Sequence, residues 1–173
     1  MSTGALLVSA LLITLTGCSM TSSTESDDIP SAGTSTSQDA AQNTQKVSSD
    51  LYDLIGVKGK ASDSSPGVQA CADKDRDKYF RIFHAWSFYA ASSGELDGVM
   101  ERFRTELPKH GWKVTEYGPD TSKNRNLSLT ADNDAKKRSV NVSYRAKDET
   151  PKLSFFVTSG CYQVPDGQDV EHF

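Results

Sequence analysis

The chain has 173 residues, of which 36% are hydrophobic, and a formal net charge of -4 at pH 7. This length allows one domain with appendages, and the low hydrophobic content predicts that part of the chain lies outside a packed core. Four of the 23 acidic residues precede Lys46, and the remaining 19 match the 19 Lys and Arg side chains. The rest of the chain is therefore formally neutral and lacks the positive patch of a nucleic-acid-binding protein, which excludes that class of partner.

The N-terminus has the pattern of an export signal. Residues 5–16 form an apolar run of 12 residues, about 18 Å long as a helix and too short for a hydrocarbon core of roughly 30 Å. The run ends in Leu15-Thr16-Gly17-Cys18, which resembles the bacterial lipobox. The resemblance implies a signal peptide at residues 1–17 and diacylglycerol on the Cys18 thiol, anchoring the protein to the outer face of the cell membrane. A buried N-terminal helix with an incidental cysteine is the competing interpretation.

A Ser/Thr-rich tract follows this cysteine. Ser and Thr make up 11 of the 19 residues from Ser19 to Ser37, which predicts a disordered tether over residues 18–46. Residues 47–173 are then expected to form a single α+β domain. It begins with a short helix over residues 47–55, which ends at Gly56 and carries its apolar side chains on one side. These side chains are Val47, Leu51, Leu54 and Ile55.

The longest helical period in the domain runs from Gly94 to Leu107 and predicts its main helix. The apolar side chains of this stripe are Leu96, Val99, Met100, Phe103 and Leu107. Alternating segments on either side predict five strands. They cover residues 79–89, 112–117, 126–131, 139–144 and 152–158. We therefore expect a two-layer sandwich, with one main helix packed on a five-stranded, mainly antiparallel sheet in the chain order β-α-β-β-β-β.

Two cysteines remain once Cys18 is assigned to lipid. Cys71 and Cys161 lie in an exported domain, where disulfides persist, so we expect them to pair; two free thiols are the alternative. The bond would bring the start of the first strand close to the end of the fifth. This favours the strand order 1-5-4-3-2 over a cystatin-like order 1-2-3-4-5.

No catalytic or metal-binding motif is found in the sequence. His84, His110 and His172 are scattered without the spacing of a zinc site, so we expect no metal, no cofactor and no catalytic residue. His84 lies among aromatic residues and is expected to be a buried, hydrogen-bonded histidine, with a catalytic base as the alternative. The basic run 136–138 is expected to be a solvated hairpin tip, with contact to anionic lipid as the alternative.

The sheet face turned away from the main helix is the candidate ligand face. Tyr79, Phe83 and Phe156 would cluster there among hydroxyl and amide side chains if the first and fifth strands pair. Exposed aromatic residues in such a setting suit a sugar or a peptide. In the competing interpretation, the apolar side chains of the helix at residues 47–55 cover this cluster.

The segment Leu107-Pro108-x-x-Gly111-Trp112-x-Val114, the polar alternating strands and Ser159-Gly160-Cys161 together resemble small uncharacterised lipoproteins of actinobacteria. The resemblance implies a lipid-anchored protein and brings no known activity. We expect a non-enzymatic binding or interaction module at the cell surface, with a cell-wall or protein ligand. A hydrolase or hydrolase accessory acting on wall polymers, and an inhibitor or immunity-type protein, are the alternatives.

Overall fold

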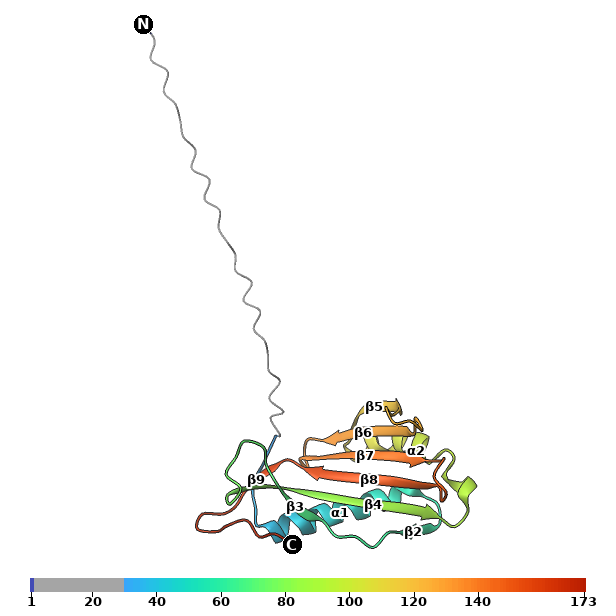
Figure 1. Ribbon diagram of the computed structural model, residues 1–173, viewed down its shortest axis with the longest axis horizontal. Coiled ribbons are helices and arrows are strands. Elements are labelled where there is room, and N and C mark those ends of the chain that lie inside the picture. Colours follow the sequence, from blue (N-terminus) through green and yellow to red (C-terminus); the bar gives the residue numbers. More distant parts are fainter. Residues whose placement is uncertain (2–29) are drawn as a thin grey trace.

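The computed structural model describes Met1 and residues 30–173, which form a curled, mixed sheet of nine strands and two α-helices (Figure 1). The strands are β1 (Ser31–Thr34), β2 (Gly59–Ala61), β3 (Gly67–Ala70), β4 (Tyr79–Ala90), β5 (Lys113–Pro119), β6 (Leu127–Asn133), β7 (Arg138–Arg145), β8 (Lys152–Ser159) and β9 (Cys161–Gln163). The helices are α1 (Ser37–Ile55) and α2 (Val99–Glu106), with the 3₁₀ turns η1 (Ser93–Leu96) and η2 (Leu107–His110) flanking α2.

The five strands that the sequence predicts are β4, β5, β6, β7 and β8. They lie in the order β4-β8-β7-β6-β5, and each pairs antiparallel with its neighbour. This confirms the predicted order 1-5-4-3-2 and excludes the cystatin-like order.

The predicted fold class is wrong, because the sheet has four further strands and the main helix is a different one. The 12-residue strand β4 is longer than β8, so it also pairs with β9 beyond the end of β8 and with β2 and β3 along its other edge. The pairing of β1 with β9 is parallel, which makes the sheet mixed. Short polar strands of three or four residues carry too little apolar alternation to be recognised in a sequence.

The longest helix, α1, lies mostly where a disordered tether was expected. It begins at Ser37 rather than Val47, and the expectation of disorder is therefore wrong for residues 31–46. Thr36 caps its N-terminus, since the Asp39 amide donates to Thr36 Oγ1 at 3.1 Å and the Thr36 hydroxyl donates to the Asp39 carboxylate at 2.8 Å. The first part of the buried stripe consists of small side chains, which allow the helix to lie close to the sheet. These side chains are Ser37, Ala40, Ala41, Thr44 and Ser48.

The predicted helix from Gly94 to Leu107 is interrupted. Asp97 is extended and Gly98 has a φ of 81°, so the chain turns from η1 into the eight-residue helix α2. A positive φ is a conformation that glycine adopts without steric cost. The predicted stripe is nevertheless buried as a whole, because η1, α2 and η2 together present it to the sheet. Its members are Leu96, Val99, Met100, Phe103 and Leu107.

Both helices pack on the same face of the sheet and lie behind it in the view of Figure 1. The core contains Val47, Leu51 and Ile55 of α1, the stripe of the α2 region, and the residues of β4, β6, β7 and β8 that point to this side. Within residues 30–173, no helix covers the opposite face, which we call the outer face.

Candidate functional site

The outer face carries a layer of hydrogen-bonded polar side chains over β5, β6 and β7. The Asn141 side-chain amide donates to Ser128 Oγ and to Thr130 Oγ1, both at 3.1 Å. The hydroxyls of Ser128 and Ser143 are 3.3 Å apart, and Thr130 Oγ1 donates to the Glu116 carboxylate at 3.3 Å. These contacts hold the side chains in fixed positions and leave their remaining donors and acceptors to solvent or a ligand.

An aromatic pair adjoins this layer. The rings of Phe83 on β4 and Phe156 on β8 are stacked, with centroids 5.8 Å apart and planes inclined by 29°. Phe156 is 42% exposed, and its cross-strand partner on β7 is Asn141. The prediction that these two aromatic side chains meet is confirmed, whereas the competing interpretation, in which the helix at residues 47–55 covers them, is wrong. Its apolar residues Val47, Leu51 and Ile55 pack in the core on the other face.

Tyr79 lies apart from the aromatic pair. It faces Gln163 of β9, and the Lys74 ammonium lies 5.0 Å from its ring centroid. Tyr79 and Phe83 are four positions apart on the extended strand, so their Cα atoms are separated by about 13 Å. Only two of the three predicted ligand-face residues therefore form one cluster.

A break in register changes which β5 side chains belong to the outer face. The pairing of β5 with β6 shifts between Val114 and Glu116, so Glu116 faces Thr130 on the outer face. Tyr117 turns to the helix side, where the Arg104 guanidinium lies 5.4 Å from its ring centroid. The sequence showed regular alternation here, and nothing in it indicated the bulge.

A hollow of about 670 Å³ lies at the β5–β6 end of the outer face, where Ser128, Asn141 and Ser143 form one wall. Asp120 lines it too and accepts hydrogen bonds from the Ser122 hydroxyl at 2.6 Å and from the Asn126 amide groups. The Ser122 hydrogen bond, together with those from Asn126, lowers the pKa of Asp120 below its ordinary value. The hollow is therefore polar and holds a carboxylate that stays ionised at neutral pH.

A pocket of about 360 Å³ lies on the opposite side of the sheet, between α1 and β4. It is lined by Gln45, Ser48, Ser49, Tyr52 and Asp53 of α1, by Ala61, Ser62 and Ser64 in and after β2, and by His84 and Trp86 of β4. The sequence did not predict this site, because part of α1 was expected to be a tether and no strand was expected before residue 79.

His84 lies at the base of this pocket and is 3% exposed. Its Nδ1 is 2.8 Å from Ser48 Oγ, and its Nε2 is 3.2 Å from Ser64 Oγ and 3.3 Å from the Ser64 carbonyl oxygen. Burial lowers the pKa of His84, and the hydrogen bond to the Ser64 carbonyl opposes this only in part. The imidazole is thus neutral at pH 7, with Nε2 donating to Ser64 and Nδ1 accepting from Ser48, which confirms the prediction of a buried, hydrogen-bonded histidine.

Trp86 supplies a polar atom without a partner. Its ring stacks on Phe155 with centroids 3.9 Å apart, and the side chain is 6% exposed. The indole Nε1 is buried and has no hydrogen-bond partner among the described residues. A buried donor without an acceptor costs free energy, so this atom lowers the stability of the core around it.

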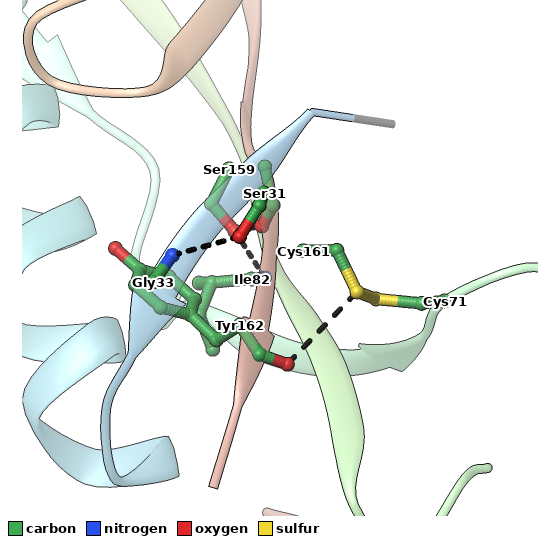
Figure 2. Close-up of a disulfide and its surroundings, with 8 residues drawn as sticks. Ser31, Gly33, Cys71, Ile82, Ser159, Cys161 and Tyr162 are labelled. Atoms are coloured by element: carbon green, nitrogen blue, oxygen red, sulfur yellow. Dashed lines mark hydrogen bonds between the residues drawn. A yellow bond between two sulfur atoms is a disulfide. The ribbon is translucent and has the colours of Figure 1, made fainter. Parts of the chain in front are cut away.

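Cys71, in the loop after β3, is bonded to Cys161 at the start of β9, with the two Cα atoms 6.1 Å apart (Figure 2). The predicted disulfide is confirmed. Beside it, Ser159 Oγ accepts from the Ile82 amide at 2.8 Å and donates to the Gly160 carbonyl at 2.7 Å.

Gly160 connects β8, which pairs with β7, to β9, which pairs with β1. The Gly160 amide donates to the Lys137 carbonyl and the Cys161 amide to the Pro30 carbonyl. A Cβ at Gly160 would lie 2.4 Å from the Pro30 carbonyl oxygen, which explains why a glycine is required here.

Among residues 30–173, no group of three or more His, Cys, Asp or Glu side chains is placed to hold a metal ion. No helix in the same part of the chain is long and apolar enough to cross a membrane. Cys18, the predicted site of lipid attachment, lies outside the described residues. Comparison with protein-family models, with curated proteins and with solved structures found no match.

Proposed function

We propose that this protein is a non-enzymatic binding module, held at the outer face of the cell membrane by diacylglycerol on Cys18, and that its outer face binds a glycan chain of the cell wall. The observation that carries this proposal is the uncovered outer face, on which the partly buried Phe83 and the exposed Phe156 form a stacked pair beside a layer of amide and hydroxyl groups.

The chemistry of this face suits a sugar chain. The apolar C–H face of a sugar ring packs on an aromatic side chain, and its hydroxyl groups exchange hydrogen bonds with amides and hydroxyls. Phe83 and Phe156 offer the first kind of contact, and Asn141 with its serine and threonine neighbours offers the second. Because these side chains lie on paired strands, the face is rigid and loses little conformational entropy on binding.

The position of the anchor is compatible with this ligand. The chain between Cys18 and Pro30 spans at most about 40 Å when fully extended. A domain that begins at Pro30 would therefore stay near the membrane, where the inner part of a cell wall lies within its reach.

Binding is tested with full-length protein carrying Cys18→Ser, which keeps it free of lipid. We expect this protein to sediment with purified cell-wall material, and the further change Phe83→Ala with Phe156→Ala to reduce the bound fraction at least tenfold. Phe173→Ala is the matched control, because Phe173 is also an exposed aromatic residue but lies at the C-terminus. Thermal unfolding of each variant shows whether the fold is intact.

Equal sedimentation of the folded double variant and the control would refute the glycan-binding face. Recovery of a protein instead of a polysaccharide from a cell-wall extract would also count against it and would favour an inhibitor or immunity-type role.

The anchor is tested separately through Cys18→Ser. The variant should leave the membrane fraction and accumulate in the medium or as an uncleaved precursor, because it lacks the thiol that would carry the lipid. The unaltered protein should show a diacylglycerol adduct on residue 18 by mass spectrometry. Membrane retention without a lipid on residue 18 would contradict the proposed anchoring.

A further inference from the structure

We propose that the pocket between α1 and β4 is a second binding site, which takes a neutral, polyhydroxylated molecule of monosaccharide or disaccharide size. This second proposal is independent of the glycan-binding face. His84 and Trp86 point to the helix side of β4, whereas Phe83 points to the outer face. The volume of about 360 Å³ is within the range of small-molecule sites.

The first argument is the aromatic ring of Trp86, which lines the pocket. The ring stacks on Phe155 with centroids 3.9 Å apart. This packing fixes the position of the ring before a ligand arrives, so the pocket has a rigid aromatic wall for the C–H face of a sugar ring.

The second argument is the number of hydroxyl groups that surround the pocket. Ser62 Oγ accepts a hydrogen bond from the Ser87 amide at 3.0 Å, which leaves its own hydrogen to donate to a ligand. The Gln45 side chain adds an amide from α1. Groups that can both donate and accept match the hydroxyls of a polyol, which also do both.

The third argument is shape and charge. Tyr52 and Trp86 lie 6.4 Å apart between ring centroids and are tilted by 42°, so they form two aromatic walls for the C–H face of a ring. Asp53 is the only charged side chain among the described residues that line the pocket. One carboxylate without a cation beside it disfavours a phosphate or carboxylate ligand and can accept hydrogen bonds from hydroxyls at the rim.

The experiment is a titration of the ¹⁵N-labelled Cys18→Ser protein, followed by the indole N–H signals of its two tryptophans. Trp86→Phe assigns the signals, because it removes one of them and keeps an aromatic ring on Phe155. The neutral probes are glucose, N-acetylglucosamine and maltose, and the anionic probe is glucose 6-phosphate.

At least one neutral probe should shift the Trp86 signal saturably, with a dissociation constant on the order of 1 mM or lower. Glucose 6-phosphate should leave the signal unchanged.

Two variants then locate the site. Ser62→Ala should weaken the binding of the active probe at least tenfold, measured through the Trp86 indole signal, because it removes a hydroxyl that lines the pocket. The pair Phe83→Ala and Phe156→Ala should leave the affinity unchanged.

The proposal is overturned if none of the neutral probes moves the Trp86 signal, or if Ser62→Ala binds the active probe as tightly as the unaltered protein. Neither result bears on cell-wall sedimentation, so failure of this site and failure of the outer face can be told apart.

Discussion

Burial of His84 makes the free energy of unfolding depend on pH. The folded protein holds this imidazole neutral, with a lowered pKa, whereas in the unfolded chain the same group takes up a proton near pH 6.5. Between these two values the unfolded state binds more protons than the folded state. The free energy of unfolding therefore rises with pH in this window. On acidification, stability is lost from about pH 6.5 down to the lowered pKa of the folded state.

We predict that urea unfolding between pH 5 and pH 8 will show this loss in the unaltered protein. His84→Gln should be less stable at pH 7, because its contacts with Ser48 and Ser64 are altered, but it should show a smaller loss on acidification. His172→Gln is the control, since His172 is exposed near the C-terminus. The same pH dependence in the His84 variant and the unaltered protein would contradict the assignment.

At the scale of elements, a side chain of α2 forms a hydrogen bond with the end of α1. The Arg102 guanidinium of α2 donates to the Ile55 carbonyl at the C-terminal end of α1. The last turn of α1 has no basic residue of its own, so Arg102 supplies both the hydrogen bond and the positive charge that a helix C-terminus favours.

Arg102→Met should therefore reduce the free energy of unfolding by about 1–2 kcal/mol. Arg104→Met is a matched control on the same helix, because the contacts of Arg104 with the Glu101 carboxylate and the Tyr117 ring are exposed. This change should cost less than about 1 kcal/mol. Chemical denaturation measures both values. Equal losses in the two variants would show that the contact with α1 contributes nothing.

The sequence predicted elements well where apolar residues recur at a regular spacing. The five main strands and the buried stripe of the α2 region follow from such spacing, and the disulfide supplied the strand order. The first half of α1 was missed, whereas the helix predicted at residues 47–55 forms its second half. The first half is buried through Ala40, Ala41 and Thr44, small residues that resemble a linker in composition. Their spacing is nevertheless helical, and Thr36 with Asp39 is a capping pattern that could have revealed the start.

The candidate site was predictable in part. Phe83 and Phe156 could be placed together because a strand alternates its side chains and the strand order brought β4 beside β8. The pocket could not be found in this way. It requires three separate segments, and one of them, residues 59–64, has no apolar pattern that indicates where it packs.

For the whole molecule, the disulfide between Cys71 and Cys161 closes a loop with a sequence separation of 90 residues. This loop contains β4 to β8 and α2, which is most of the sheet. In the chain-entropy account, closing a loop of this length raises the free energy of the unfolded state by about 4–5 kcal/mol. The bond should therefore carry a large share of the stability of a domain of this size.

We predict that a reductant will lower the melting temperature strongly, as followed by circular dichroism. The double variant Cys71→Ala with Cys161→Ala should melt near the reduced protein and should not respond to the reductant. A melting temperature that is the same with and without reductant in the unaltered protein would refute the stabilising role.

The parallel pairing of β1 with β9 has a mechanical consequence for a protein that is anchored as proposed. A force applied through the chain that precedes Pro30 acts first on β1 and is transmitted to β9 through the hydrogen bonds between the two strands. The first residue of β9, Cys161, is bonded to Cys71. If the protein is stretched from its two ends, the disulfide shields residues 72–160 from the load, and only the segments outside the loop can extend. Reduction would release about 300 Å of additional chain, so the redox state of one bond sets how far this domain can be drawn from the membrane.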